Sequence, residues 1–135
     1  MKAREALEQA LAVLRRDELA AWVQIEDALA GLVVECAIGE EWFHVHAGSG
    51  LRVLPAQPEE ADASARTARR TILELIDGEV SLLEAIRSGR LDMLASTPVL
   101  LRLAQAQRAF AEGAARARDV QPVLEQYRAA ASELP

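Results

Sequence analysis

Residues Thr67 to Gly89 read TARRTILELIDGEVSLLEAIRSG, and the rest of the chain is organised around them. It holds two short apolar patterns with helical spacing, and a glycine stops each of them, Gly78 the first and Gly89 the second. Ser81 stands where the second helix needs an N-terminal cap. Each predicted helix has about ten residues, which is too short for stability alone in water. Both helices therefore have to pack on an apolar surface, and we expect the preceding residues to supply it as a sheet.

The apolar residues before this stretch change from helical to alternating spacing at Leu32. Three segments with alternating apolar residues and glycine-rich turns between them predict three sequential strands, at 32–38, 42–47 and 51–54. Small and polar residues alternate over 61–66, which predicts a weak fourth strand at an edge of the sheet. We expect these four strands to pair as an antiparallel meander. A fifth strand is expected over 91–95, reached by a crossover through the two short helices.

Amphipathic helices are expected on both sides of the strand region. One apolar stripe runs through 3–15, and a second helix is expected over 17–30. Pro98 suits the first turn of a later helix that is predicted to end at Gly113. The last helix carries a stripe of Val120, Val123, Leu124, Tyr127, Ala131 and Leu134. Strands followed by helices that collect on one face of an antiparallel sheet make an α+β layered domain.

The organising stretch also resembles the second half of the sterol carrier protein type-two domain. The matching elements read ILELIDGE over 72–79 and EAIRSGRL over 84–91. The resemblance covers 22–113, with one departure, because the Gly-Asp that members often have after the last strand is replaced by ASTP at 95–98. It implies an antiparallel sheet of about five strands covered on one face by helices, which agrees with the α+β layered domain. It further implies an apolar tunnel that holds a sterol, a fatty acyl chain or another lipid.

Length and charge narrow the class of protein. The 135 residues predict a single domain, with 1–16 as an N-terminal helical extension, 17–113 as the core and 114–135 as a C-terminal helix. The net charge is −6, and the first 60 residues hold 11 acidic but only 5 basic side chains. Such a charge distribution argues against binding to nucleic acid or to anionic lipid headgroups. Without a signal peptide pattern or an apolar run of membrane-spanning length, we expect a cytoplasmic protein with no stable membrane insertion.

The predicted lipid-binding residues come from the inward strand faces, the two short helices and the late helix. They are Phe43, Val45, Val53, Leu73, Ile76, Leu83, Ile86, Met93, Leu100, Leu103 and Phe110. An apolar cavity and a filled core have the same periodicity, so the cavity rests on the resemblance. Many inward positions are alanine, which leaves open a structural or partner-binding module with the same fold and a filled core. The two terminal apolar stripes also need a cover: the C-terminal helix can close over the end of its own domain as a lid, or both terminal helices can take part in a homodimer, which is the expected form.

Catalytic constellations are missing from the sequence, and we expect a noncatalytic protein without a cofactor. Cys36, the only cysteine, lies on an aliphatic strand face and is expected to be a small buried hydrophobe. His44 and His46 share one face of a strand, about 7 Å apart, which leaves a metal-dependent enzyme as a weaker alternative. The segment GEEWFHVHAG around them is similar to the start of a cupin metal motif, but the glutamate that this motif needs a few residues later is missing. We therefore predict no metal site and a partly exposed strand face.

Overall fold

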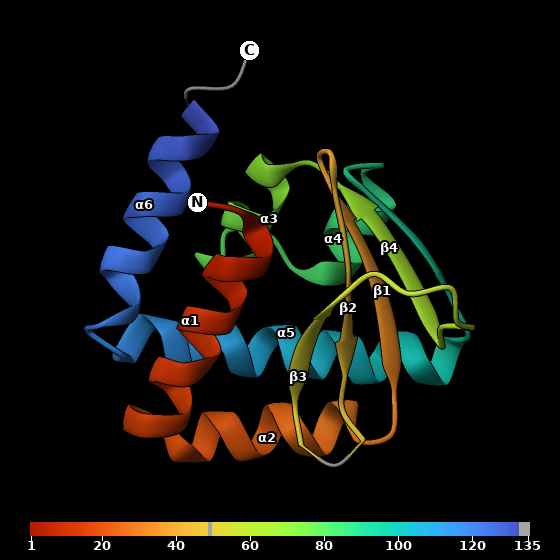
Figure 1. Ribbon diagram of the computed structural model, residues 1–135, viewed down its shortest axis with the longest axis horizontal. Helices are drawn as coiled ribbons and strands as arrows, with labels where there is room; N and C mark the ends of the chain where they lie inside the picture. The colour runs from red at the N-terminus through yellow and green to blue at the C-terminus, as the bar shows by residue number, and fades with distance from the viewer. Residues whose placement is uncertain (49, 133–135) are drawn as a thin grey trace.

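An open five-stranded sheet carries the helices on one of its faces in the computed structural model (Figure 1). The structure describes residues 1–48 and 50–132, with side chains as far as 129. The helices are α1 (Ala3–Asp17), α2 (Leu19–Leu29), α3 (Arg69–Ile76), α4 (Leu82–Arg87), α5 (Thr97–Arg116) and α6 (Val120–Ser132). The strands are β1 (Val33–Ile38), β2 (Glu41–His46), β3 (Arg52–Pro55), β4 (Ala63–Thr67) and β5 (Leu91–Ala95). The predicted α+β class and the five strands are confirmed, whereas Leu134 and the Ala131 side chain lie outside the described part.

The order of strands in the sheet is β3-β2-β1-β4-β5. β1, β2 and β3 form the expected antiparallel meander. The prediction of an edge strand at 61–66 was wrong, because β4 pairs with β1 in parallel and with β5 in antiparallel fashion. The segment between β3 and β4 crosses back over β2 and β1 in Figure 1, so β4 runs in the direction of β1 and the sheet is mixed. Small residues such as Ala63 have little strand propensity of their own, and pairing on both sides overrides that propensity.

The two short helices end as the sequence predicts. Gly78 follows α3 with a φ of 75°, and Gly89 follows α4 with a φ of 78°. The Ser81 side chain accepts a hydrogen bond from the Glu84 backbone N–H at 3.1 Å, which caps α4. Among the described residues, the structure contains no helix that is long and apolar enough to cross a membrane.

Replacing Gly78 or Gly89 with alanine is expected to lower the free energy of unfolding by about 1 kcal/mol each, because a Cβ disfavours a positive φ. Urea unfolding of the purified variants measures the change. Gly48→Ala is a matched control, since Gly48 has no positive φ and a Cβ there would meet no atom within 4 Å. An unchanged unfolding midpoint in both test variants would contradict the expected backbone strain.

The late helix α5 does not end at Gly113 as predicted but continues to Arg116. Gly113 is buried where α5 crosses the two N-terminal helices. A Cβ on it would lie 2.8 Å from the Cβ of Ala21 and 3.0 Å from a methyl carbon of Leu14. This glycine therefore permits a close approach of α5 to α1 and α2. Glycine is needed at 113 for packing between helices, not to end α5.

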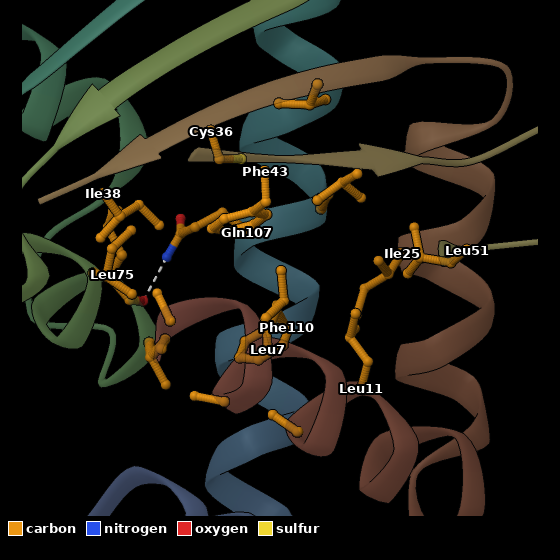
Figure 2. Close-up of a pocket in the computed structure, with 18 of the residues that line it drawn as sticks. Leu7, Leu11, Ile25, Cys36, Ile38, Phe43, Leu51, Leu75, Gln107 and Phe110 are labelled. Carbon is orange, nitrogen blue, oxygen red and sulfur yellow. Dashed lines mark hydrogen bonds between the residues drawn. The ribbon is translucent and has the colours of Figure 1, made fainter. Parts of the chain in front are cut away.

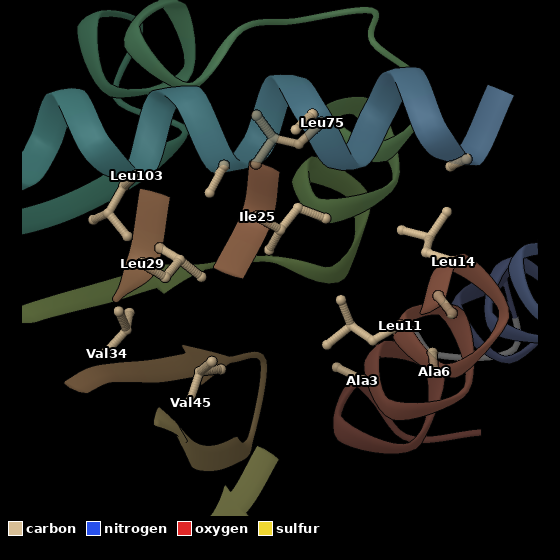
Figure 3. Packing of buried hydrophobic residues seen from close by; sticks show 14 of the residues in the cluster. Ala3, Ala6, Leu11, Leu14, Ile25, Leu29, Val34, Val45, Leu75 and Leu103 are labelled. Carbon is tan, nitrogen blue, oxygen red and sulfur yellow. The ribbon is translucent and has the colours of Figure 1, made fainter. Parts of the chain in front are cut away.

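The terminal helices α1 and α6 pack on each other within the chain (Figure 1). Leu14 of α1 is completely buried, as is Val120 of α6. Figure 3 shows Ala3, Ala6 and Leu11 of α1 directed into the same core as side chains of α2, α3, α5 and the sheet. As far as the side chains are described, both apolar stripes are covered by the chain itself, so this part of them no longer argues for a homodimer.

Candidate ligand cavity

An apolar cavity of about 240 Å³ lies between the inner face of the sheet and the helices (Figure 2). The strand side of its wall follows from alternation and register, because Val34 pairs with Val45 and Cys36 with Phe43 on the same face. In another protein, an engineered apolar cavity of about 150 Å³ binds benzene. The cavity here is therefore large enough for a sizeable apolar group.

Helices α1, α2, α3, α5 and α6 complete the wall with their apolar faces. Their larger lining side chains are Leu7, Leu11, Ile25, Leu29, Ile72, Leu75, Ile76, Leu103, Phe110, Leu124 and Tyr127. Between them the wall includes short side chains, namely Ala3, Ala6, Ala10 and Ala106. The methyl group of an alanine is too short to reach across the space between sheet and helices. These four positions therefore leave a volume open that leucine side chains would fill.

Two polar side chains stand in this apolar wall. The Gln107 amide nitrogen donates to the Leu75 carbonyl oxygen at 2.7 Å (Figure 2). The Tyr127 ring is 1% exposed, with the Arg69 guanidinium 4.6 Å from its centre, and its hydroxyl has no hydrogen-bond partner among the described residues. Burial raises the pKa of Tyr127 above its usual value. The neutral hydroxyl of Tyr127 and the amide oxygen of Gln107 are the polar groups that a ligand with a polar end could meet.

Cys36 lines the cavity from β1 as a free, half-buried cysteine. Burial raises the pKa of the Cys36 thiol to about 12, and the nearby Glu35 charge adds to the effect. The group is therefore a thiol at neutral pH, without the thiolate that a nucleophile needs.

The structure brings only some of the predicted lipid-binding residues to the cavity. Those that line it are Phe43, Val45, Ile76, Leu103 and Phe110. Those that are half-buried beside the core are Val53, Leu73 and Leu100, whereas Ile86 and Met93 line a separate, more polar hollow along β4 and β5. Leu83 is 42% exposed, because Leu82 and Ala85 form the buried face of α4. A ligand-binding role for any of these residues stays a prediction.

The prediction missed the part of the wall that α1, α2 and α6 contribute, such as Leu7, Ile25 and Tyr127. The signal was present in the amphipathic stripes of the terminal helices, for which the sequence left a lid and a dimer contact as alternatives. Helical periodicity shows that a face is covered but does not say what covers it.

On the face of the sheet opposite the cavity, the burial of the histidine side chains differs from the prediction. His44 is completely buried, although the strand pattern predicts a partly exposed face. The segment from β3 to β4 passes over it, and the Gln57 backbone N–H donates to His44 Nδ1 at 3.0 Å. Glu59 in the same segment lies 2.5 Å from Nε2 of His46. A connection distant in the sequence thus covers this face.

Comparison with known proteins gives a fold but no sequence match. No family model and no curated protein matches the chain. The sterol carrier protein domain 2 of Helicoverpa armigera is similar with a TM-score of 0.62 and 13% identity, covering 79% of this chain and 89% of that chain. A ubiquinone synthesis protein, UbiJ-SCP2, is similar with a TM-score of 0.59 and 20% identity, covering 76% of this chain and 85% of that chain. Apo sterol carrier protein 2 from Yarrowia lipolytica is similar with a TM-score of 0.57 and 11% identity, covering 78% of this chain and 87% of that chain. At these identities the likeness is one of structure, and the chain has the fold of the sterol carrier protein type-two domain.

Proposed function

We propose that this protein binds and carries a hydrophobic small molecule or lipid in the cavity between sheet and helices, without chemical change. The observation that carries the proposal is the apolar cavity of about 240 Å³ in a chain with the sterol carrier fold. Ligand sites of this kind are concave and apolar, with few polar groups that orient the ligand. Here these groups are Gln107 and Tyr127.

The chemistry of the wall supports a carrier rather than an enzyme. Cys36 is a cysteine in the cavity wall, and its raised pKa of about 12 holds it as a thiol. Apart from Cys36, Gln107 and the Tyr127 hydroxyl, the wall offers aliphatic and aromatic surface, which favours a sterol, a fatty acyl chain or another lipid by burial of apolar area.

The alternative function is a structural or partner-binding module with a filled core. The short alanine side chains in the wall favour the carrier function over this alternative, since they leave the space between sheet and helices open. The two functions differ in a measurable property, which is whether the purified protein takes up an apolar molecule.

Extraction of the purified protein, followed by mass spectrometry of the extract, tests the proposal. We expect a copurified lipid, or saturable binding of a fluorescent fatty acyl probe at one site per chain when the protein has been delipidated. Lipid-free buffers and a mock purification from cells that lack the protein control for lipid carried over from the cells. A protein that yields no lipid and does not bind the probe would refute the carrier function and favour the structural module.

A further inference from the structure

Three side chains with metal-ligating atoms meet on the face of the sheet opposite the cavity. His44 and His46 come from β2, and Glu59 comes from the segment that crosses from β3 to β4. One ligating atom of each lies within 4.8 Å of the others. Glu59 Oε1 is 2.5 Å from Nε2 of His46 and 3.9 Å from Nδ1 of His44. We propose that these three side chains bind one Zn²⁺ ion, which ties the crossing segment to the sheet.

The contact between His46 and Glu59 is close but is not an aligned hydrogen bond. Nε2 of His46 is buried and has no hydrogen-bond partner within the described residues, although a carboxylate oxygen of Glu59 lies beside it. In the tautomer with its proton on Nδ1, His46 offers the lone pair of Nε2 beside this carboxylate oxygen. A cation bound by both atoms would satisfy them once they have moved apart from 2.5 Å, because two ligands that are each about 2.0–2.1 Å from one zinc ion lie further from each other.

Glu35 is the carboxylate beside the other ring nitrogen of His44. Its Oε2 lies 3.6 Å from Nε2 of His44, which is beyond hydrogen-bond length and leaves Nε2 without a hydrogen-bond partner among the described residues. Its Oε1 accepts a hydrogen bond from the Ser64 hydroxyl at 3.4 Å. Metal-binding histidines direct their second N–H to such a carboxylate. A proton on Nε2 of His44 would face Glu35 and leave the lone pair on Nδ1, which is the nitrogen on the side of Glu59.

The lone pair on Nδ1 of His44 accepts the Gln57 backbone N–H at 3.0 Å, which requires the same tautomer. Zinc and this N–H compete for one lone pair, so binding of the ion moves the Gln57 amide away from the ring. The crossing segment exchanges a hydrogen bond to β2 for a metal bond through Glu59. Binding should consequently change the environment of the Gln57 amide as well as both imidazole rings.

The donor set and its access both suit zinc. Two imidazole nitrogens and one carboxylate oxygen form a set that zinc prefers, with water in the fourth position. The Glu59 side chain is 35% exposed, so an ion can approach from the side of this carboxylate and then meet the buried Nε2 of His46. The chain has only two histidines, and its one cysteine lies on the other face of the sheet. Any zinc binding that requires a histidine side chain therefore takes place at this site.

Titration of the metal-free protein with Zn²⁺, followed by calorimetry and by NMR of the histidine rings, tests the site. We expect one zinc per chain, shifts of both histidine signals and of the Gln57 amide, and a melting temperature that rises with zinc and falls again with EDTA. Glu59→Gln should reduce the affinity by more than the roughly 10–100-fold expected for Glu35→Gln, which only loses the orienting carboxylate.

Glu60→Gln is the matched control, because it removes the same charge from the same segment and Glu60 is not one of the three ligands. It should retain the affinity of the parent protein. His46→Asn is a second test variant, since His46 is partly exposed and its replacement is easier to tolerate than that of buried His44. The site would be disproved if zinc fails to bind at one per chain, or if Glu60→Gln loses as much affinity as Glu59→Gln.

Discussion

Leu103→Trp is expected to weaken the binding of a fluorescent fatty acyl probe at least about tenfold, equivalent to about 1.4 kcal/mol. Leu103 lies on α5 and contributes to the cavity wall (Figure 3). A larger side chain can extend into the cavity and occupy the volume that the ligand would use. The free energy of unfolding should change by less than about 1 kcal/mol, because space is available and overpacking is avoided.

Leu101→Trp provides the control for this experiment. Leu101 is on the same helix but is 52% exposed and does not line the cavity. Its replacement should leave both probe binding and stability close to those of the parent protein. If Leu103→Trp instead destabilises the fold by about 1–3 kcal/mol, as overpacking of a filled core does, the structural module is the better description.

Gly113→Ala is expected to lower the free energy of unfolding by about 1–2 kcal/mol. Alanine is preferred over glycine in a helix by about 1 kcal/mol, so a free site on α5 would become more stable. At Gly113 the added methyl group would instead lie 2.8 Å from the Cβ of Ala21, and separation of α5 from α2 costs more than the helix gains. Urea unfolding monitored by circular dichroism measures the balance.

Moving the glycine to the partner helix tests the cause. Ala21→Gly removes the opposing methyl group, and the double variant with Gly113→Ala should be more stable than the sum of the two single changes predicts. A favourable coupling of about 1 kcal/mol is expected for residues in direct contact. Simple additivity, or a more stable Gly113→Ala variant, would show that the helices are not closely packed at this point.

The local features of this fold could be predicted from the sequence because they depend on neighbouring residues. A positive φ after a short apolar pattern needs glycine, as at Gly78 and Gly89, and the alternation in 32–54 needs no distant partner to predict strands. The resemblance in 72–91 then led from these elements to the sterol carrier fold. The same periodicity identified Phe43, Val45 and Leu103 as inward-facing.

Features that depend on residues far apart in the sequence were decided only by the tertiary structure. β4 became an interior strand because the chain crosses back over the sheet, and the same crossing buried His44 and brought Glu59 to His46. In the sequence, Gly113 stands where a helix would end, but in the structure it lies inside α5 and packs against Ala21 of α2.

The helices, the strands and the covered face of each follow from the amino-acid sequence, because backbone preference and periodicity set them. What covers each face, and whether the space inside is filled, depends on contacts between elements that are far apart in the sequence. The volume of the cavity depends on the lengths of side chains from five helices and the sheet together. The short alanines of α1 leave it open because α1 packs over the sheet.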